Sequence, residues 1–180
     1  MNEMSTICLD PGHGGADPGA VGNGLHESDV VLDIALKARA YLEAVGHSVV
    51  MTRETDTFDM DELQLRCDVS DNSGADVFIS IHCNSANSAS ATGTETFYQA
   101  GSEKGHRLAA YVQQQLLSLG LDDRGLKTNP LYVVRCTEAP AILVELGFLS
   151  NPYDADIINN NRDEFAAAIA RGITDYLYGE

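Results

Sequence analysis

The sequence predicts a single α/β domain built on a mostly parallel, twisted β-sheet with helices on both faces. Short apolar segments typical of strands alternate with segments of helical periodicity along the chain, as in parallel sheets whose strands are joined by crossover helices. The 180 residues suit one domain with a substantial core and are too few for two domains of ordinary size. We therefore expect residues 1–180 to form one unit.

The expected strands are short apolar runs bounded by turn residues, and the expected helices carry apolar residues at helical spacing. The strands lie at 4–9, 48–52, 77–81, 94–98, 131–134 and 141–146. The helices lie at about 28–45, 61–72, 103–119 and 162–177. In a parallel sheet, the strands that end at Leu9, Ile81 and Leu146 would share one edge, where open α/β sheets place their ligand sites.

The charge of the chain narrows its range of partners. Asp and Glu number 27 against 11 Lys and Arg, which gives a formal net charge of −16 and disfavours nucleic acid or an acidic membrane surface as a partner. No apolar run approaches the ~20 residues that span a bilayer, and the first residues carry no export signal. We expect a protein that is cytoplasmic until lysis releases it, that leaves by another route, or that is a domain of a longer secreted chain.

The four cysteines form no CxxC pair and lie in apolar segments, so we expect buried free thiols rather than a disulfide framework. They are Cys8, Cys67, Cys83 and Cys136. Cys83 adjoins a histidine, but alternation along a strand would point it to the opposite face. Among the five histidines, His47 and His106 are expected to be ordinary surface side chains.

Two histidines stand where expected strands emerge from the sheet. His13 lies in the turn Pro11-Gly12-His13-Gly14-Gly15, and His82 follows the run 77–81. Two imidazoles on rigid elements suggest a metal site, and glycine-rich turns would let the chain fold back and bring Glu27 to it. Two histidines, a carboxylate and an open position form the usual ligand set of hydrolytic zinc. Alternatively, Glu27 only stabilises a helix start, or His26 takes its place as ligand.

Glu145 is the only charged residue in the hydrophobic run 140–148. A buried strand rarely carries an unpaired carboxylate, so Glu145 is either a catalytic base or the partner of an arginine. The candidate arginines are Arg66, Arg124 and Arg135. The sequence has neither the Lys-Ser/Thr ending of a phosphate-binding loop nor a GxSxG nucleophile elbow, which argues against an NTPase and a serine hydrolase.

The order of the motifs resembles the zinc-dependent N-acetylmuramoyl-L-alanine amidases, cell-wall hydrolases of the autolysin, spore-lytic and phage endolysin types. The similar stretches span essentially the full length and lie at 9–20, 52–56, 65–66, 80–84, 93–98 and 139–151. The resemblance implies that His13, Glu27 and His82 bind one Zn²⁺. It also implies that Glu145 is general base and then general acid, which decides between the two interpretations of that residue.

The same resemblance implies peptidoglycan as the substrate, cleaved at the amide bond between N-acetylmuramic acid and L-alanine of the stem peptide. A separate wall-binding module would offset the acidity of this chain. No long helical insertion lies between Tyr98 and Leu131, so an open site is expected. Two rivals remain: a zinc carboxypeptidase that uses Arg135 to hold a terminal carboxylate, and a non-catalytic wall-binding domain, which would have no need of Glu145.

Overall fold

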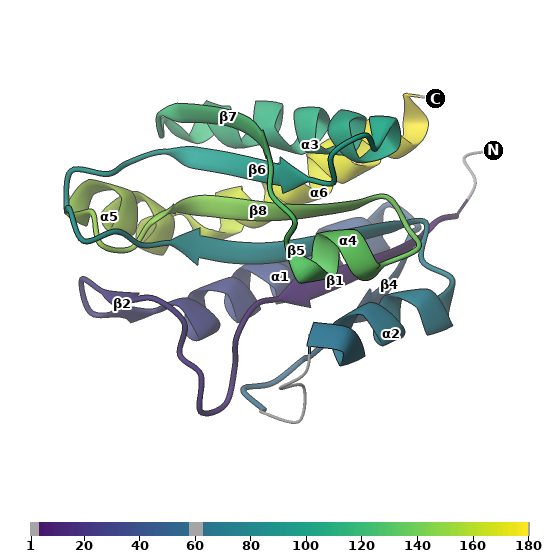
Figure 1. The fold of residues 1–180 in the computed structure, drawn as a ribbon, viewed down its shortest axis with the longest axis horizontal. Coiled ribbons are helices and arrows are strands. Elements are labelled where there is room, and N and C mark those ends of the chain that lie inside the picture. Colours follow the sequence, from purple (N-terminus) through teal and green to yellow (C-terminus); the bar gives the residue numbers. More distant parts are fainter. Residues whose placement is uncertain (1–3, 58–62, 180) are drawn as a thin grey trace.

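The computed structural model describes residues 4–57 and 63–179, and its centre is a six-stranded sheet (Figure 1). The strands are β1 (Thr6–Pro11), β4 (Ser48–Met51), β5 (Val77–Asn84), β6 (Thr94–Tyr98), β7 (Asp123–Thr128) and β8 (Ala141–Phe148). Their order is β4-β1-β5-β8-β6-β7, and every neighbouring pair is parallel except β6 and β8. The expected mostly parallel sheet is confirmed.

Helices cover both faces of this sheet, as the sequence predicts. They are α1 (Glu27–Ala44), α2 (Leu63–Ser73), α3 (Glu103–Leu116), α4 (Tyr132–Cys136), α5 (Pro152–Asn160) and α6 (Arg162–Tyr178). Helices α1, α3 and α6 pack on one face, and α2 and α4 pack beside each other on the other (Figure 1). Within the described residues, no helix is both long and apolar enough to cross a bilayer.

Alternation along the central strands divides the buried side chains between two cores. In β5, Ile79 and Ile81 face the larger core, under α1, α3 and α6, whereas Phe78 faces the smaller core, under α2 and α4. Cys83 is 4% exposed and belongs to the larger core, so the expectation that it points away from its histidine neighbour is confirmed. The expectation of four buried thiols is wrong for Cys136, which is only half-buried.

One expected strand is wrong. Residues 131–134 read as a strand because they combine an aromatic with β-branched residues, but the structure places a short helix, α4, at Tyr132–Cys136. Pro130 precedes it, and Val133 and Val134 pack into the smaller core. Tertiary packing here outweighs the intrinsic preference of these residues for strands.

Three elements of the structure were not predicted from the sequence. The edge strand β7 is polar, and helix α5 begins after Asn151, whose side chain accepts a hydrogen bond from the Tyr153 N–H, with Pro152 in the first turn. The third is a small hairpin of β2 (Val21–Gly22) and β3 (Leu25–His26). The Asn-Gly pair at its turn is the strongest short signal for such a hairpin.

The expectation that His47 is a surface side chain is also wrong, because the residue is only 4% exposed. Gly46, at φ 97°, turns the chain directly from α1 into β4, and the His47 ring lies 5.5 Å from the Tyr178 ring near the end of α6. Both ring nitrogens are buried, and neither has a hydrogen-bond partner among the described residues. Burial lowers the pKa of His47 below its usual 6.5. His106, by contrast, is exposed as expected.

Candidate metal centre

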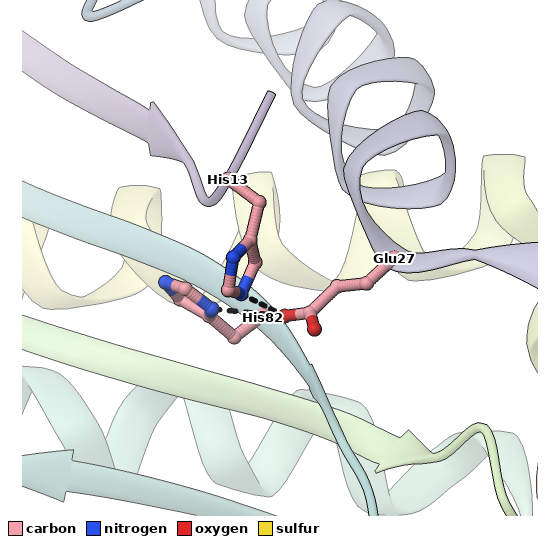
Figure 2. A group of neighbouring side chains, drawn as sticks. All are labelled: His13, Glu27 and His82. Carbon is pink, nitrogen blue, oxygen red and sulfur yellow. Dashed lines mark hydrogen bonds and ion pairs between the residues drawn. The ribbon is translucent and has the colours of Figure 1, made fainter. Parts of the chain in front are cut away.

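His13, Glu27 and His82 meet at the sheet edge formed by the carboxyl ends of β1 and β5 (Figure 2). His13 follows β1, Glu27 begins α1, and His82 lies near the end of β5. One oxygen, Oε1 of Glu27, lies 3.2 Å from Nε2 of His13 and 2.9 Å from Nδ1 of His82. All three groups offer a ligand atom within 4.8 Å of the others. The structure thus brings together residues that stand far apart in the sequence.

Glu27 is held toward this cluster by the backbone. Its Oε2 accepts a hydrogen bond from Ala20 N–H at 2.8 Å, and its Oε1 accepts one from Cys83 N–H at 2.9 Å. The side chain is therefore turned into the site rather than simply placed at a helix start. His26 is exposed and approaches Asp29 at 3.8 Å, so it lies outside the cluster.

The proton affinities of these groups reflect their proximity. The hydrogen bond to Glu27 is the main reason that the pKa of His13 rises to about 9. Burial by itself would raise the pKa of Glu27, but hydrogen bonds from His13 and His82 outweigh burial and lower it. The cluster therefore keeps its carboxylate charged and attracts positive charge, which suits a cation.

Two glycines make room for the cluster. A Cβ atom on Gly12 would lie 2.2 Å from Cε1 of His82, and one on Gly19 would lie 2.6 Å from Oε2 of Glu27. Gly19 also has φ +64°, a left-handed conformation that side chains disfavour. The His13 loop can approach the side chains of Glu27 and His82 only because both glycine positions lack a side chain.

Two buried arginines hold the loop from the other side. Arg53 donates hydrogen bonds to the carbonyls of Pro11 and Gly12 at 2.9 and 2.8 Å, and Arg66 donates to the carbonyls of Pro11 and His13, both at 2.9 Å. His13 itself has φ 57°, which is uncommon for a residue other than glycine and needs support from its surroundings. The arginines supply that support through three successive carbonyls.

Asp10 anchors this arrangement within the sheet. It is 1% exposed and accepts hydrogen bonds from Arg66 at 2.6 Å, Thr52 at 2.6 Å and Ser80 at 2.7 Å. Burial opposes the charged form, but Arg66 and the two hydroxyls outweigh it and lower the pKa of Asp10. The carboxylate is therefore charged, paired and fully satisfied beneath the His13 loop.

Glu145 lies on β8 beside His82, because the two residues are register partners on neighbouring parallel strands and their side chains share a face. Within the described residues, its Oε2 is buried with no hydrogen-bond partner. Burial raises the pKa of Glu145 to about 7. The ion pairs considered from the sequence are absent among the described residues: Arg66 pairs with Asp10, and Arg124 pairs with Glu95.

A groove of about 230 Å³ opens next to the cluster. His13 and His82 line it together with Leu63 of α2, Tyr132 of α4 and Leu131, which directly precedes α4. The groove therefore runs from the candidate metal ligands between the two helices of the smaller core. It offers an apolar wall on which a ligand could lie while its reactive bond faces the cluster.

A parallel sheet with a His-Glu-His cluster at its carboxyl edge and an unpaired buried carboxyl beside it is typical of metal-dependent hydrolases. Residues 7–175 match the N-acetylmuramoyl-L-alanine amidase family. The chain belongs to this family.

Relatives and a solved structure that are named as amidases support this family assignment. The chain is 42% identical over 178 residues to the N-acetylmuramoyl-L-alanine amidase LytC of Bacillus subtilis, covering 95% of this chain and 35% of LytC. It is 35% identical over 189 residues to the germination-specific N-acetylmuramoyl-L-alanine amidase of the same organism, covering 95% of this chain and 79% of the relative. The crystal structure of an N-acetylmuramoyl-L-alanine amidase from Clostridium difficile 630 superposes with a TM-score of 0.92 at 37% identity, covering 100% of both chains.

The sequence indicates the cluster but not the roles of the residues that support it. Asp10, Asp17 and Arg53 stand only within stretches similar to the family. Arg66 stands in such a stretch too and is otherwise considered only as a partner of Glu145. Their signal was a set of charged residues next to expected buried strands. Buried charged side chains need partners, so this pattern indicates a buried hydrogen-bond network. It does not indicate which backbone carbonyls the arginines would hold.

Proposed function

We propose that residues 1–180 form the catalytic domain of a peptidoglycan amidase, which hydrolyses the amide bond between N-acetylmuramic acid and L-alanine of the stem peptide. The observation that carries the proposal is the cluster of His13, Glu27 and His82 beside the unpaired carboxyl of Glu145, in a chain of this family. In this proposal the cluster holds one Zn²⁺, and Glu145 is the catalytic base and then the acid.

The donor atoms fit zinc. Two imidazoles and a carboxylate leave one position open, as in hydrolytic zinc sites, and ligand atoms around a tetrahedral zinc lie roughly 3.3 Å apart. The nitrogen–oxygen separations of 3.2 and 2.9 Å around Glu27 are close to that spacing. The lowered pKa of Glu27 supports the charged form that a metal ligand requires.

Bound zinc would supply Lewis-acid polarisation of the scissile carbonyl and a lower pKa for water. Glu145 would supply the proton transfer. A carboxyl with a pKa of about 7 can take a proton from the attacking water and return it to the departing amine near neutral pH. Its Oε2 has no hydrogen-bond partner to displace among the described residues, which supports this role.

The two rival functions fit less well. A carboxypeptidase needs a cation that holds the terminal carboxylate only one residue beyond the scissile bond, but Arg135 lines a hollow separate from the groove that contains His13 and His82. A wall-binding domain without chemistry has no use for the buried, unpaired carboxyl of Glu145, which disfavours folding. Both features support the amidase.

The test is digestion of purified peptidoglycan, with mass analysis of the soluble products. The expected products are stem peptides with a free L-alanine amine, lost on chelation, restored by Zn²⁺ and absent for Glu145→Gln. Glu138→Gln, at an exposed glutamate, is the matched control and should keep full activity. Release of single amino acids would favour the carboxypeptidase, and sedimentation with an intact wall would favour the binding domain.

We further propose that the chain acts on the cell wall together with a separate wall-binding module. The chain spans 35% of LytC, which leaves room in such relatives for other segments. A net charge of −16 weakens adsorption to anionic wall polymers, so a module with its own affinity would compensate. Fusion of a wall-binding module to this chain should increase its sedimentation with purified walls.

A further inference from the structure

Helix α4 contributes residues to two hollows. Tyr132 and the preceding Leu131 line the groove next to the candidate metal ligands. Arg135 lines a second hollow of about 260 Å³ together with Gln99 and Asn129. We call this second hollow the Arg135 hollow. Helix α4 packs on β8 and β5 and is labelled in Figure 1.

Arg135 is an exposed cation with no acidic partner among the described residues. In the described part of the chain no carboxylate pairs with it, whereas Arg66 pairs with Asp10, and Arg124 and Lys127 pair with Glu95. None of the described residues that line the Arg135 hollow is acidic. In a chain with 27 acidic and 11 basic residues, an unpaired guanidinium in a hollow is a specific place for an anion.

The chemistry of the hollow favours a carboxylate. A guanidinium binds a carboxylate through two parallel hydrogen bonds, and the amides of Gln99 and Asn129 add further donors. The Arg135 guanidinium carbon lies 5.8 Å from the centre of the Tyr132 ring. The ring limits the directions that the guanidinium can take and leaves its edge available to a ligand.

The groove and the Arg135 hollow lie close enough together for one extended peptide to reach both. Tyr132 and Arg135 are three residues apart on one helix, a spacing that places side chains as neighbours. An extended peptide advances about 3.3–3.6 Å per residue, so roughly two residues span the 5.8 Å between the Tyr132 ring and the guanidinium. A peptide that begins at the metal ligands and passes Tyr132 would bring a carboxylate further along to Arg135.

We propose that the Arg135 hollow is a specificity subsite in which Arg135 binds a carboxylate of the stem peptide. This inference rests on the proposed function, since it takes the stem peptide as the ligand. The carboxylate belongs either to an acidic residue within the peptide or to its C-terminus. Both sources present the same chemistry to Arg135.

The test compares hydrolysis of soluble muramyl tetrapeptides by wild type, Arg135→Gln and Arg171→Gln. Arg171 is an exposed arginine on α6, a helix of the opposite layer, so its variant matches the change in charge. For the peptide with free carboxylates, Arg135→Gln should raise KM about tenfold with little change in kcat. Arg171→Gln should leave KM unchanged, and Arg135→Lys should restore part of the loss.

Two further substrates identify the carboxylate, one amidated at the internal acidic residue and one amidated at the C-terminus. Amidation of the group that Arg135 binds should raise the wild-type KM and remove the difference between wild type and Arg135→Gln. Equal KM values for the two proteins on every substrate would overturn the inference and leave the amidase proposal intact.

Binding of the free stem tetrapeptide, measured by NMR titration, separates the two proposals. If wild type cleaves no amide but binds the tetrapeptide, and Arg135→Gln binds it about tenfold more weakly, the proposed activity fails and the subsite stands. If wild type and Arg135→Gln bind equally, or wild type does not bind, the subsite is wrong.

Discussion

Oδ2 of Asp17 lies 2.7 Å from Nδ1 of His13, whose Nε2 lies 3.2 Å from Glu27. A second oxygen of Asp17 accepts a hydrogen bond from Gly19 N–H at 3.0 Å. One exposed carboxylate thus fixes both the orientation of the imidazole and the turn that leads back to Glu27. Carboxylates in this position raise the basicity of histidine ligands.

Asp17→Asn should therefore weaken zinc binding by about 10- to 100-fold. The amide keeps the shape of the side chain but loses the charge that supports the His13 ring. Competition with a chromophoric chelator measures the affinity directly. Asp156→Asn, at an exposed position on α5, is the control. Equal zinc affinity for Asp17→Asn and wild type would show that Asp17 does not position His13.

Asp10→Asn should lower the free energy of unfolding by about 3–5 kcal/mol, because it leaves Arg66 as a buried cation without a carboxylate. Urea denaturation measures the change. Asp33→Asn removes a half-exposed partner of Lys37 and Arg162 and should cost at most about 1 kcal/mol. Similar losses for the two variants would contradict the anchoring role of Asp10.

His47 should make the domain less stable in mild acid. Burial lowers the pKa of His47 below 6.5, so the unfolded chain takes up a proton at a higher pH than the folded chain does. This contribution to stability is present above pH 6.5 and is lost as the pH falls through the folded-state pKa.

The measurement is urea denaturation at several pH values for wild type, His47→Phe and His106→Gln. His13 titrates in all three proteins, so the difference between each variant and wild type isolates the substituted residue. Stability of His47→Phe relative to wild type should increase as the pH falls below 6.5, whereas His106→Gln should follow wild type. A constant difference for His47→Phe would rule out a neutral buried imidazole.

Gly12→Ala should abolish tight zinc binding, because its Cβ would lie 2.2 Å from Cε1 of His82 and displace that ring. Gly74→Ala is the control. Gly74 has φ +63° with no other atoms within 4 Å of the added Cβ, so this variant should lose about 1–2 kcal/mol of stability and keep its zinc affinity. Calorimetric titration with zinc distinguishes the two, and unchanged affinity in Gly12→Ala would refute the steric argument.

The sheet and the grouping of His13, Glu27 and His82 could be predicted from the sequence because their signals are local. Strands such as β5 are continuous apolar runs, and His13 and His82 each follow one at the edge of the sheet. Parallel order then brings the strand ends together. The position of Glu27 near the histidines could also be predicted, because glycines in the sequence before it indicate a turn that folds the chain back.

Other features depended on contacts between distant segments. Helix α4 forms because Val133 and Val134 find a core between α2 and the sheet, and β7 pairs at an edge where polar residues suffice. His47 is buried because the end of α6 reaches it. None of these contacts leaves a periodic pattern in the residues concerned, so local reasoning could not find them.

The position of β8 sets an order of events during synthesis. It comes after the other five strands of the sheet in the described part of the chain, yet it lies between β5 and β6. A ribosome has already released the three candidate ligands, all within the first 82 residues, before the strand that carries Glu145 emerges. A nascent chain could thus hold its candidate metal ligands while still lacking the carboxyl proposed to move protons, so hydrolytic competence would come only after β8 has been synthesised and has paired with β5.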